Sequence, residues 1–212
     1  TWVMCWLYLG TFGSFIGFSA GFPLLIKSQF PGVNPLAFAW MGPFLGALIR
    51  PVGGWLADKT GGARVSLGVF VVMTAGVYGV MQYLPHHGAS GNLTGFFLCF
   101  MVLFVASGIG NGSTFRMIPV IFMDECLDAA RGQGAEAQAA AAREGSKQGA
   151  AALGFTAAIG AYGGFFIPTS YGTSIDMTGS PHAALWWFIV FYVTCIAITW
   201  WFYARRGALR PC

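Results

Sequence analysis

The sequence predicts an all-α membrane protein with six transmembrane helices. Hydrophobic residues make up 56% of the 212-residue chain and charged residues only 8%, whereas soluble domains carry about 25% charged residues. The apolar residues gather in six runs, each long enough to cross a bilayer as a helix of about 20 residues. None of these runs alternates polar and apolar residues, as the strands of a membrane β-barrel do.

The six expected spans occupy residues 2–25, 36–56, 65–84, 93–123, 150–171 and 182–203. Polar residues and the turn formers Pro, Gly and Asn separate them. The longest connection, 124–149, is rich in Ala, Glu and Gln, which favour helix. We expect it to be a partly helical cytoplasmic linker, with a binding module as the alternative. Three spans, a long linker and three more spans fit the repeat found inside one half of some transporters.

The basic residues are distributed unequally between the two sides that six spans define. One side holds only Lys27, and the other holds eight basic residues, namely Lys59, Arg64, Arg131, Arg143, Lys147, Arg205, Arg206 and Arg210. Because Lys and Arg are enriched in cytoplasmic segments of membrane proteins, we expect both ends of the chain to be cytoplasmic. The connections 27–35, 85–92 and 172–181 then face outward.

Arg50 is a cation within the apolar segment 42–54 of the second span. Such a charge costs roughly 2.5–3.5 kcal/mol near the bilayer centre on insertion-based scales. At 1.5 Å rise per residue, Arg50 lies about 6 Å from the midplane, and no acidic residue falls near the centre of any span. Its planar guanidinium matches planar oxyanions. We therefore predict that Arg50 binds an anion, with snorkelling or a structural pairing as the alternative.

Tyr8 and Phe12 of the first span are candidate walls of the same site. They are four residues apart and therefore share one face of a helix, and Phe12 lies near the middle of its span. Their expected depth is similar to that of Arg50. The alternative is that both are ordinary packing or lipid-facing aromatics.

Glycine is frequent in the fourth and fifth spans, which hold Gly108, Gly110, Gly112, Gly154, Gly160, Gly163 and Gly164. Such segments bend and bring backbone close to a small ligand, although tight helix packing is at least as good an explanation for any one of them. Arg116, nearer the cytoplasmic end, is expected to be structural or gate-related, either snorkelling or pairing with Asp124 or Glu125.

The loop after the Arg50 span is the strongest local motif. Residues 54–61 fit the pattern G-x-L-A-D-[RK]-x-G, with Gly54, Asp58, Lys59 and Gly61 at its defined positions. We expect Asp58 to contact the N-terminus of a neighbouring helix, where the helix dipole favours an anion, and Lys59 and Arg64 to form pairs at the cytoplasmic surface. This loop resembles the conserved loop of the major facilitator superfamily, although Gly62 and Ala63 replace its usual basic pair.

Segments 11–22, 42–54 and 157–168 resemble the nitrate/nitrite porter (NarK-type) family of that superfamily, and the glycine-rich fifth span resembles its nitrate signature. The resemblance runs from the first span to the last. It implies that the chain is the C-terminal half, spans seven to twelve, of a twelve-span transporter in a bacterial inner membrane. Because the chain begins at Thr1, with no signal peptide before the first span, we expect a piece of a longer chain or a fragment.

The resemblance also implies the roles of individual residues. One arginine from each half of the family's members clamps the anion between stacked aromatics; Arg50 matches the C-terminal arginine, Phe12 the stacking aromatic and Tyr8 its hydroxyl neighbour. Gly154 matches a glycine that lines the site. The glycine-rich spans would bend or slide as the two halves rock, and the N-terminal half, in the same chain or a separate one, would supply the other arginine.

We therefore expect secondary active transport of nitrate and nitrite by alternating access. The absence of a carboxylate at mid-membrane favours nitrate/nitrite antiport over proton-coupled nitrate symport. The alternatives are transport of another small anion, such as a carboxylate, and a non-transporting scaffold or truncated product.

Other chemistry finds little support in the sequence. The adjacent His86 and His87 are expected to be an exposed loop pair, and the five cysteines include no C-x-x-C pair of the kind that holds a metal or a redox disulfide. No Ser-His-Asp set, H-E-x-x-H motif or phosphate-binding loop occurs. We expect no enzyme activity, cofactor, metal or nucleic-acid partner, and a lipid bilayer as the surroundings.

Overall fold

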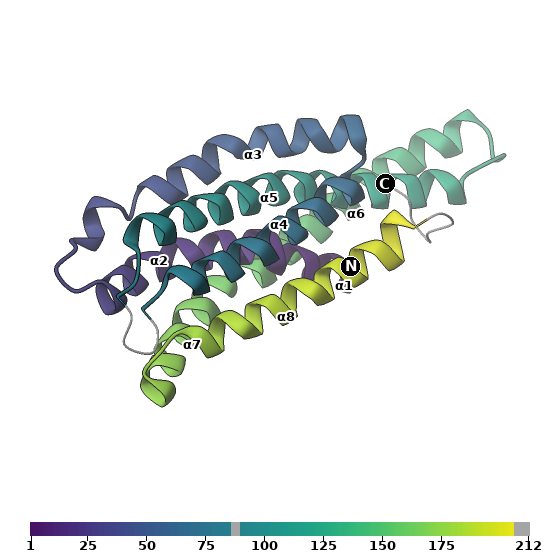
Figure 1. Ribbon diagram of the computed structural model, residues 1–212. Helices are drawn as coiled ribbons and strands as arrows, with labels where there is room; N and C mark the ends of the chain where they lie inside the picture. Colours follow the sequence, from purple (N-terminus) through teal and green to yellow (C-terminus); the bar gives the residue numbers. More distant parts are fainter. Residues whose placement is uncertain (86–89, 206–212) are drawn as a thin grey trace.

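The computed structural model describes residues 1–85 and 90–205, and every regular element in these ranges is a helix (Figure 1). His86, His87, Arg206, Arg210 and Cys212 lie outside the described residues. Six continuous helical segments are long and apolar enough to cross a membrane. This confirms the predicted fold class of six transmembrane helices. The segments are Trp2–Gln29, Pro35–Thr60, Gly62–Tyr83, Leu93–Ala129, Ala135–Thr178 and His182–Ala204.

Four of the segments contain a change of helix type or a break. The first consists of α1 (Trp2–Tyr8), the π-helix η1 (Leu9–Gly13) and α2 (Ser14–Gln29). The fifth consists of α6 (Ala135–Ala161) and α7 (Gly163–Thr178), which meet at Tyr162. The remaining elements are η2 (Pro35–Ala37), α3 (Met41–Thr60), α4 (Gly62–Tyr83), α5 (Leu93–Ala129), α8 (His182–Thr199) and the π-helix η3 (Trp200–Ala204).

The connection between the fourth and fifth spans differs most from the expectation. Helix α5 continues to Ala129, and α6 already begins at Ala135. The expected linker 124–149 is therefore mostly the ends of two membrane helices, and its Ala-rich part is continuous with the fifth span. Alanine, glutamate and glutamine favour helix in water as well as in lipid, so hydrophobicity alone does not locate these helix ends. Gly132 and Gly134, both with positive φ, form the turn between the helices.

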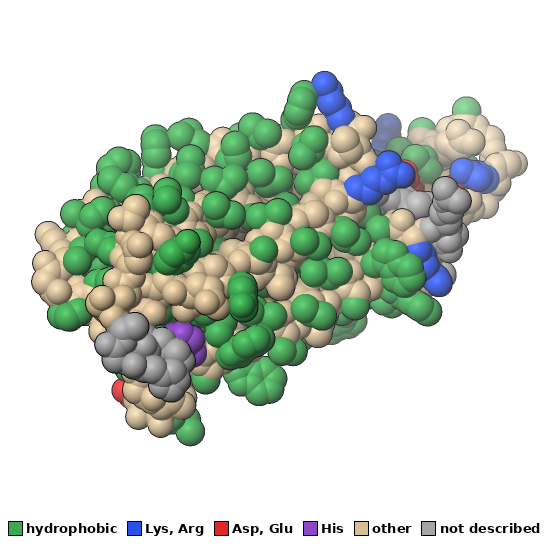
Figure 2. Space-filling model, in the orientation of Figure 1, with side chains coloured by type: hydrophobic (Ala, Val, Ile, Leu, Met, Phe, Trp, Pro, Cys, Tyr) green, Lys and Arg blue, Asp and Glu red, His purple; other side chains and the backbone are tan. Residues whose placement is uncertain are grey.

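Helix α5 is central to the bundle and packs against α3, α4 and α6, while α2 packs against α7 and α4 against α8. The marked N-terminus and the end of η3 lie at the same end of the bundle in Figure 1, as does the turn from α3 to α4. Lys and Arg side chains gather at that end in Figure 2, whereas hydrophobic side chains cover the rest of this face. The arrangement matches the charge asymmetry of the sequence.

Phenylalanine rings fill the space between α2 and α5. Phe18, Phe22, Phe96, Phe100 and Phe104 are fully buried, and the ring centroids of Phe22 and Phe100 lie 4.9 Å apart. Aromatic rings supply large contact areas at low entropic cost. This cluster holds the first span against the central helix.

Glycine allows α3 and α5 to touch along their backbones. A methyl group added to Gly53 would collide with the Ile109 carbonyl, and one added to Gly112 would collide with the Arg50 carbonyl. Gly108 meets the Gly46 carbonyl in the same way. Small residues at such crossings are typical of helix packing in membranes. At Gly108 and Gly112, therefore, tight packing accounts for the glycine.

We predict that Gly53→Ala lowers the free energy of unfolding by about 1–3 kcal/mol, the usual cost of overpacking, because the new methyl group has no space beside Ile109. Thermal unfolding of the purified protein in detergent measures the effect. Gly68→Ala is the matched control, since Gly68 is also helical and its added methyl group meets nothing within 4 Å. Equal melting temperatures for the two variants would contradict this account of the α3–α5 contact.

Candidate functional site

A π-helical turn interrupts the first span where the candidate aromatics lie. Tyr8 ends α1, and Phe12 lies within η1. Single π-turns change the direction of side chains and are frequent at functional sites. The two rings stack with centroids 5.1 Å apart and planes inclined by 29°. Tyr8 is almost fully buried, whereas Phe12 is partly exposed, so the pair has a buried member and an accessible member.

Arg50 projects from α3 and is partly buried. Its guanidinium carbon lies 5.2 Å from the centroid of the Phe115 ring, a distance at which cations interact with aromatic faces. The Tyr8 hydroxyl lies close enough to the Arg50 guanidinium to interact with it. Within the described ranges, no carboxylate lies at ion-pair distance from Arg50. The structure therefore brings the predicted cation and the predicted tyrosine together, and no described residue gives the cation an anionic partner.

Helix α6 contributes backbone to the same region through Gly160. A methyl group at this position would lie 3.0 Å from the rings of both Tyr8 and Phe12. One turn further on, a methyl group added to Gly163 would collide with the backbone of Gly13. The aromatic pair is thus held between the first span and the fifth span by close glycine contacts.

The other glycines named from the sequence differ among themselves. Gly110 packs against Thr11 and Val69, and Gly164 packs against Ile16, so both serve helix packing. Gly154 is exposed, and a methyl group there would meet nothing within 4 Å. Within this chain, Gly154 is therefore not brought into contact with the Arg50 cluster.

Buried polar side chains of η1 and α5 were not identified as site candidates from the sequence. The hydroxyls of Thr11 and Thr114 lie 2.9 Å apart and are fully buried. Asn111 is 1% exposed, and its Oδ1 has no hydrogen-bond partner among the described residues. The signal for Asn111 was its amide within an apolar, glycine-rich run, whereas the contact of Phe115 with Arg50 depends on the register between α3 and α5, which the sequence does not reveal.

The loop motif of residues 54–61 forms an ion pair that was not expected. Asp58 Oδ1 accepts a hydrogen bond from Arg116 Nε at 2.7 Å. The structure therefore gives Arg116 a partner that was not expected, Asp58, and no side-chain hydrogen bond caps the N-terminus of α4. The two residues pair because α3 and α5 run side by side and place them at the same level.

The motif itself is helical almost to its end. Helix α3 continues through Thr60, and the single residue Gly61, with φ +91°, separates it from α4. A positive φ of this kind favours glycine. Lys59 Nζ lies 4.1 Å from the ring centroid of Trp55, and neither Lys59 nor Arg64 forms an ion pair with another described residue. The surface pairs expected for these two cations are therefore not formed among the described residues.

The arrangement suits the binding of a small anion. A guanidinium offers a fork of hydrogen-bond donors, a tyrosine hydroxyl offers one more, and the partly exposed Phe12 offers a flat apolar surface. All three lie on helices that span the bilayer. No metal ligands are grouped in threes within residues 1–85 and 90–205.

Comparison with known proteins identifies the relatives of the chain. No family model matches it. It is 48% identical over 206 residues to the nitrate/nitrite transporter NarU of Escherichia coli (strain K12), covering 97% of this chain and 44% of that protein. The nitrate/nitrite transporter NarU of Salmonella typhimurium is 50% identical over 205 residues, with the same coverage.

A third relative is more distant and extends the match to the whole chain. The probable nitrate/nitrite antiporter NarK2 of Thermus thermophilus is 33% identical over 220 residues, covering 100% of this chain and 44% of that protein. The chain thus spans about half the length of the curated relatives it matches. By this similarity, the chain is a homologue of proteins named nitrate/nitrite transporters, which confirms the family resemblance of its sequence.

Proposed function

We propose that the chain is the C-terminal six-helix half of a transporter that moves nitrate and nitrite across the bacterial inner membrane by alternating access. The observation that carries the proposal is Arg50, a cation within a membrane span that has no carboxylate partner among the described residues. The names of the relatives supply the anions, since they are nitrate/nitrite transporters.

The chemistry of the Arg50 cluster fits a planar monoanion. The guanidinium would form parallel hydrogen bonds to two oxygens of nitrate or nitrite, and the Tyr8 hydroxyl would donate another. Phe12 would cover one face of the anion. Phe115, which already contacts the guanidinium, would hold Arg50 in place through its ring. The site residues proposed here are Arg50, Tyr8 and Phe12, with Gly154 as a further lining residue of the complete protein.

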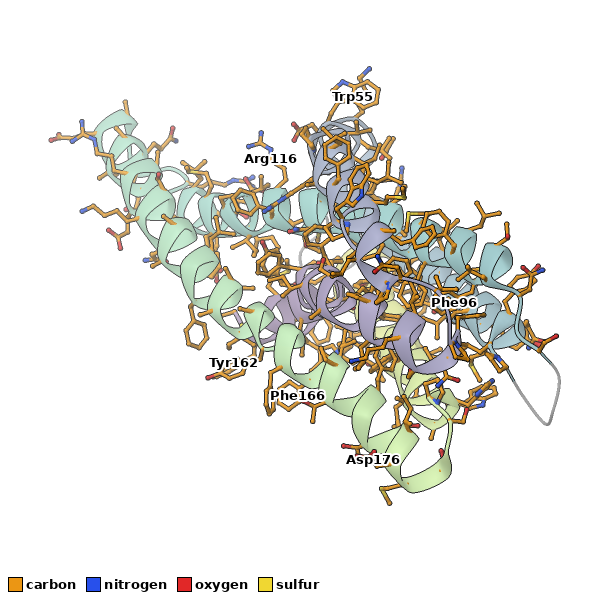
Figure 3. The ribbon with its side chains drawn as sticks, turned by 90° about the vertical axis from the view of Figure 1, so that its left-hand side faces the viewer. Trp55, Phe96, Arg116, Tyr162, Phe166 and Asp176 are labelled. Carbon is orange, nitrogen blue, oxygen red and sulfur yellow. The ribbon has the colours of Figure 1, made fainter. Side chains whose placement is uncertain are left out.

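The missing part of the site would come from an N-terminal half. Only 17% of the most apolar part of the second span is buried inside the chain. In the fifth span, the side chains of Tyr162 and Phe166 are 61% and 56% exposed. Figure 3 shows both of these side chains projecting away from the helices that carry them. We propose that these two spans pack against the other half and that the anion binds between the halves.

The positions of the carboxylates support exchange of nitrate for nitrite over proton symport. Asp58 pairs with Arg116 near the end of α3, and Asp176 lies near the opposite end of the bundle, close to the end of α7 (Figure 3). Neither stands at the depth of Arg50. We therefore propose that the protein exchanges nitrate for nitrite across the membrane, without a carboxylate proton carrier in this half. We also propose that it is a transporter and not an enzyme.

Replacement of Arg50 tests the site directly. Arg50→Lys in the full-length protein keeps the charge but loses the planar fork, so we predict at least roughly tenfold weaker nitrate binding, about 1.4 kcal/mol. Isothermal titration with nitrate measures the affinity. Unchanged affinity would remove the proposed role of Arg50.

The same titration separates nitrate from other anions. Arg131→Lys is the matched control, because Arg131 is an exposed arginine that pairs locally with Asp128 at 3.0 Å, and this variant should bind nitrate as the wild type does. Competition by acetate or lactate, with no competition by nitrite, would favour a transporter of small carboxylates instead.

The charge asymmetry further supports cytoplasmic ends and an outward α4–α5 connection. In intact cells that express a cysteine-free protein, we predict that a membrane-impermeant thiol reagent labels Ser90→Cys and does not label Gln133→Cys until the membrane is opened. Both positions are exposed, so their accessibility in an opened membrane is the internal control. The reverse labelling pattern would invert the proposed topology.

A further inference from the structure

A long apolar groove runs between α3, α4 and α5. Its volume is about 720 Å³, and its apolar lining includes Leu56, Val69, Val72, Leu98, Val102 and Ile109. Leu98, Val102 and Val72 remain 57%, 45% and 45% exposed. Hydrophobic side chains cover the face formed by these three helices in Figure 2. On helices that cross a membrane, such a groove is open to lipid hydrocarbon.

The groove lies away from the candidate anion site. Leu56 follows Arg50 by six residues, which places it about 120° around a helix of 3.6 residues per turn. Likewise, α5 presents Ile109 to the groove and Phe115 to Arg50. An occupant of the groove would therefore not contact the anion, and the inference below does not depend on the proposed transport function.

The floor of the groove is open at Gly68. This glycine lines the groove together with Arg64 and Val72, one turn to either side of it. A Cβ atom added at Gly68 would meet nothing within 4 Å. Along α5 the lining extends from Leu98 to Ile109, a distance of about 16 Å at 1.5 Å per residue. One leaflet of a hydrocarbon core of about 30 Å has a similar thickness, so the groove matches the length of one acyl chain.

One end of the groove is positively charged. Arg64 and Thr60 lie in its lining, and Arg64 forms no ion pair with any described residue. A guanidinium thus lies at the end of an apolar groove, which is an arrangement expected of a site for an anionic lipid head group.

We propose that this groove binds one acyl chain of an anionic phospholipid, with the lipid phosphate held by the Arg64 guanidinium. The guanidinium would form paired hydrogen bonds to the phosphate oxygens. The acyl chain would lie along Gly68 and Val72 against α5. The bound lipid would thereby cover the exposed apolar surface where three spans meet.

Native mass spectrometry of the full-length protein, with phosphatidylglycerol or phosphatidylcholine added to detergent micelles, tests the site. Wild type is expected to retain one phosphatidylglycerol in preference to phosphatidylcholine. Arg64→Gln should weaken phosphatidylglycerol binding by roughly fivefold, the contribution of one basic residue at an anionic surface. Equal retention of the two lipids by wild type would overturn the proposed role of Arg64.

A second pair of variants tests the groove itself. Gly68→Leu places a side chain in the open floor and should abolish retention of the lipid, whereas Gly172→Leu should have no effect. Gly172 is the matched control because it is also helical and has no atom within 4 Å of its added Cβ. Retention of phosphatidylglycerol by Gly68→Leu at the wild-type level would overturn the proposal.

Crosslinking of the wild-type protein gives a readout that does not depend on folding of the variants. Phosphatidylglycerol with a photoreactive acyl chain should crosslink mainly to residues 65–72 and 98–109. Crosslinks spread evenly over all the lipid-facing helices would contradict a specific lipid site.

Discussion

The close contact between α3 and α5 determines where Arg50 can act. Gly53 and Gly112 allow the two backbones to touch beside Ile109 and Arg50, so the height and rotation of α3 are fixed relative to the central helix. This register brings the guanidinium over Phe115 and Asp58 beside Arg116. Loss of the contact would move the cation, its aromatic support and the ion pair of the loop motif together.

The placement of Arg50 has an energetic consequence. A guanidinium in apolar surroundings is costly, and here its described neighbours are a phenylalanine face and a tyrosine hydroxyl. These contacts reduce the cost without neutralising the charge. A bound anion would neutralise the Arg50 guanidinium, and departure of the anion would restore the free-energy cost of the buried charge. A cation supported in this way is therefore suited to reversible binding, which a transporter requires, and less suited to a permanent structural role.

The fold could be predicted from the sequence because long apolar runs and charge asymmetry are properties of single segments. The same reasoning selected Arg50, Tyr8 and Phe12 as candidates for the site, since a lone cation and an i, i+4 aromatic pair are visible without knowledge of packing. The π-turn at Phe12, the Arg50–Phe115 contact and the Asp58–Arg116 pair were not predicted. Each depends on local helix geometry or on the register between helices that are distant in the chain.

The central claim is that Arg50 and Phe12 bind the transported anion from one side. A structure of the full-length protein with nitrate bound tests this claim most directly. The account predicts density for a planar anion within hydrogen-bonding distance of the Arg50 guanidinium and stacked on the Phe12 ring. Nitrate bound elsewhere, with Arg50 still directed only at Phe115 and Tyr8, would contradict it.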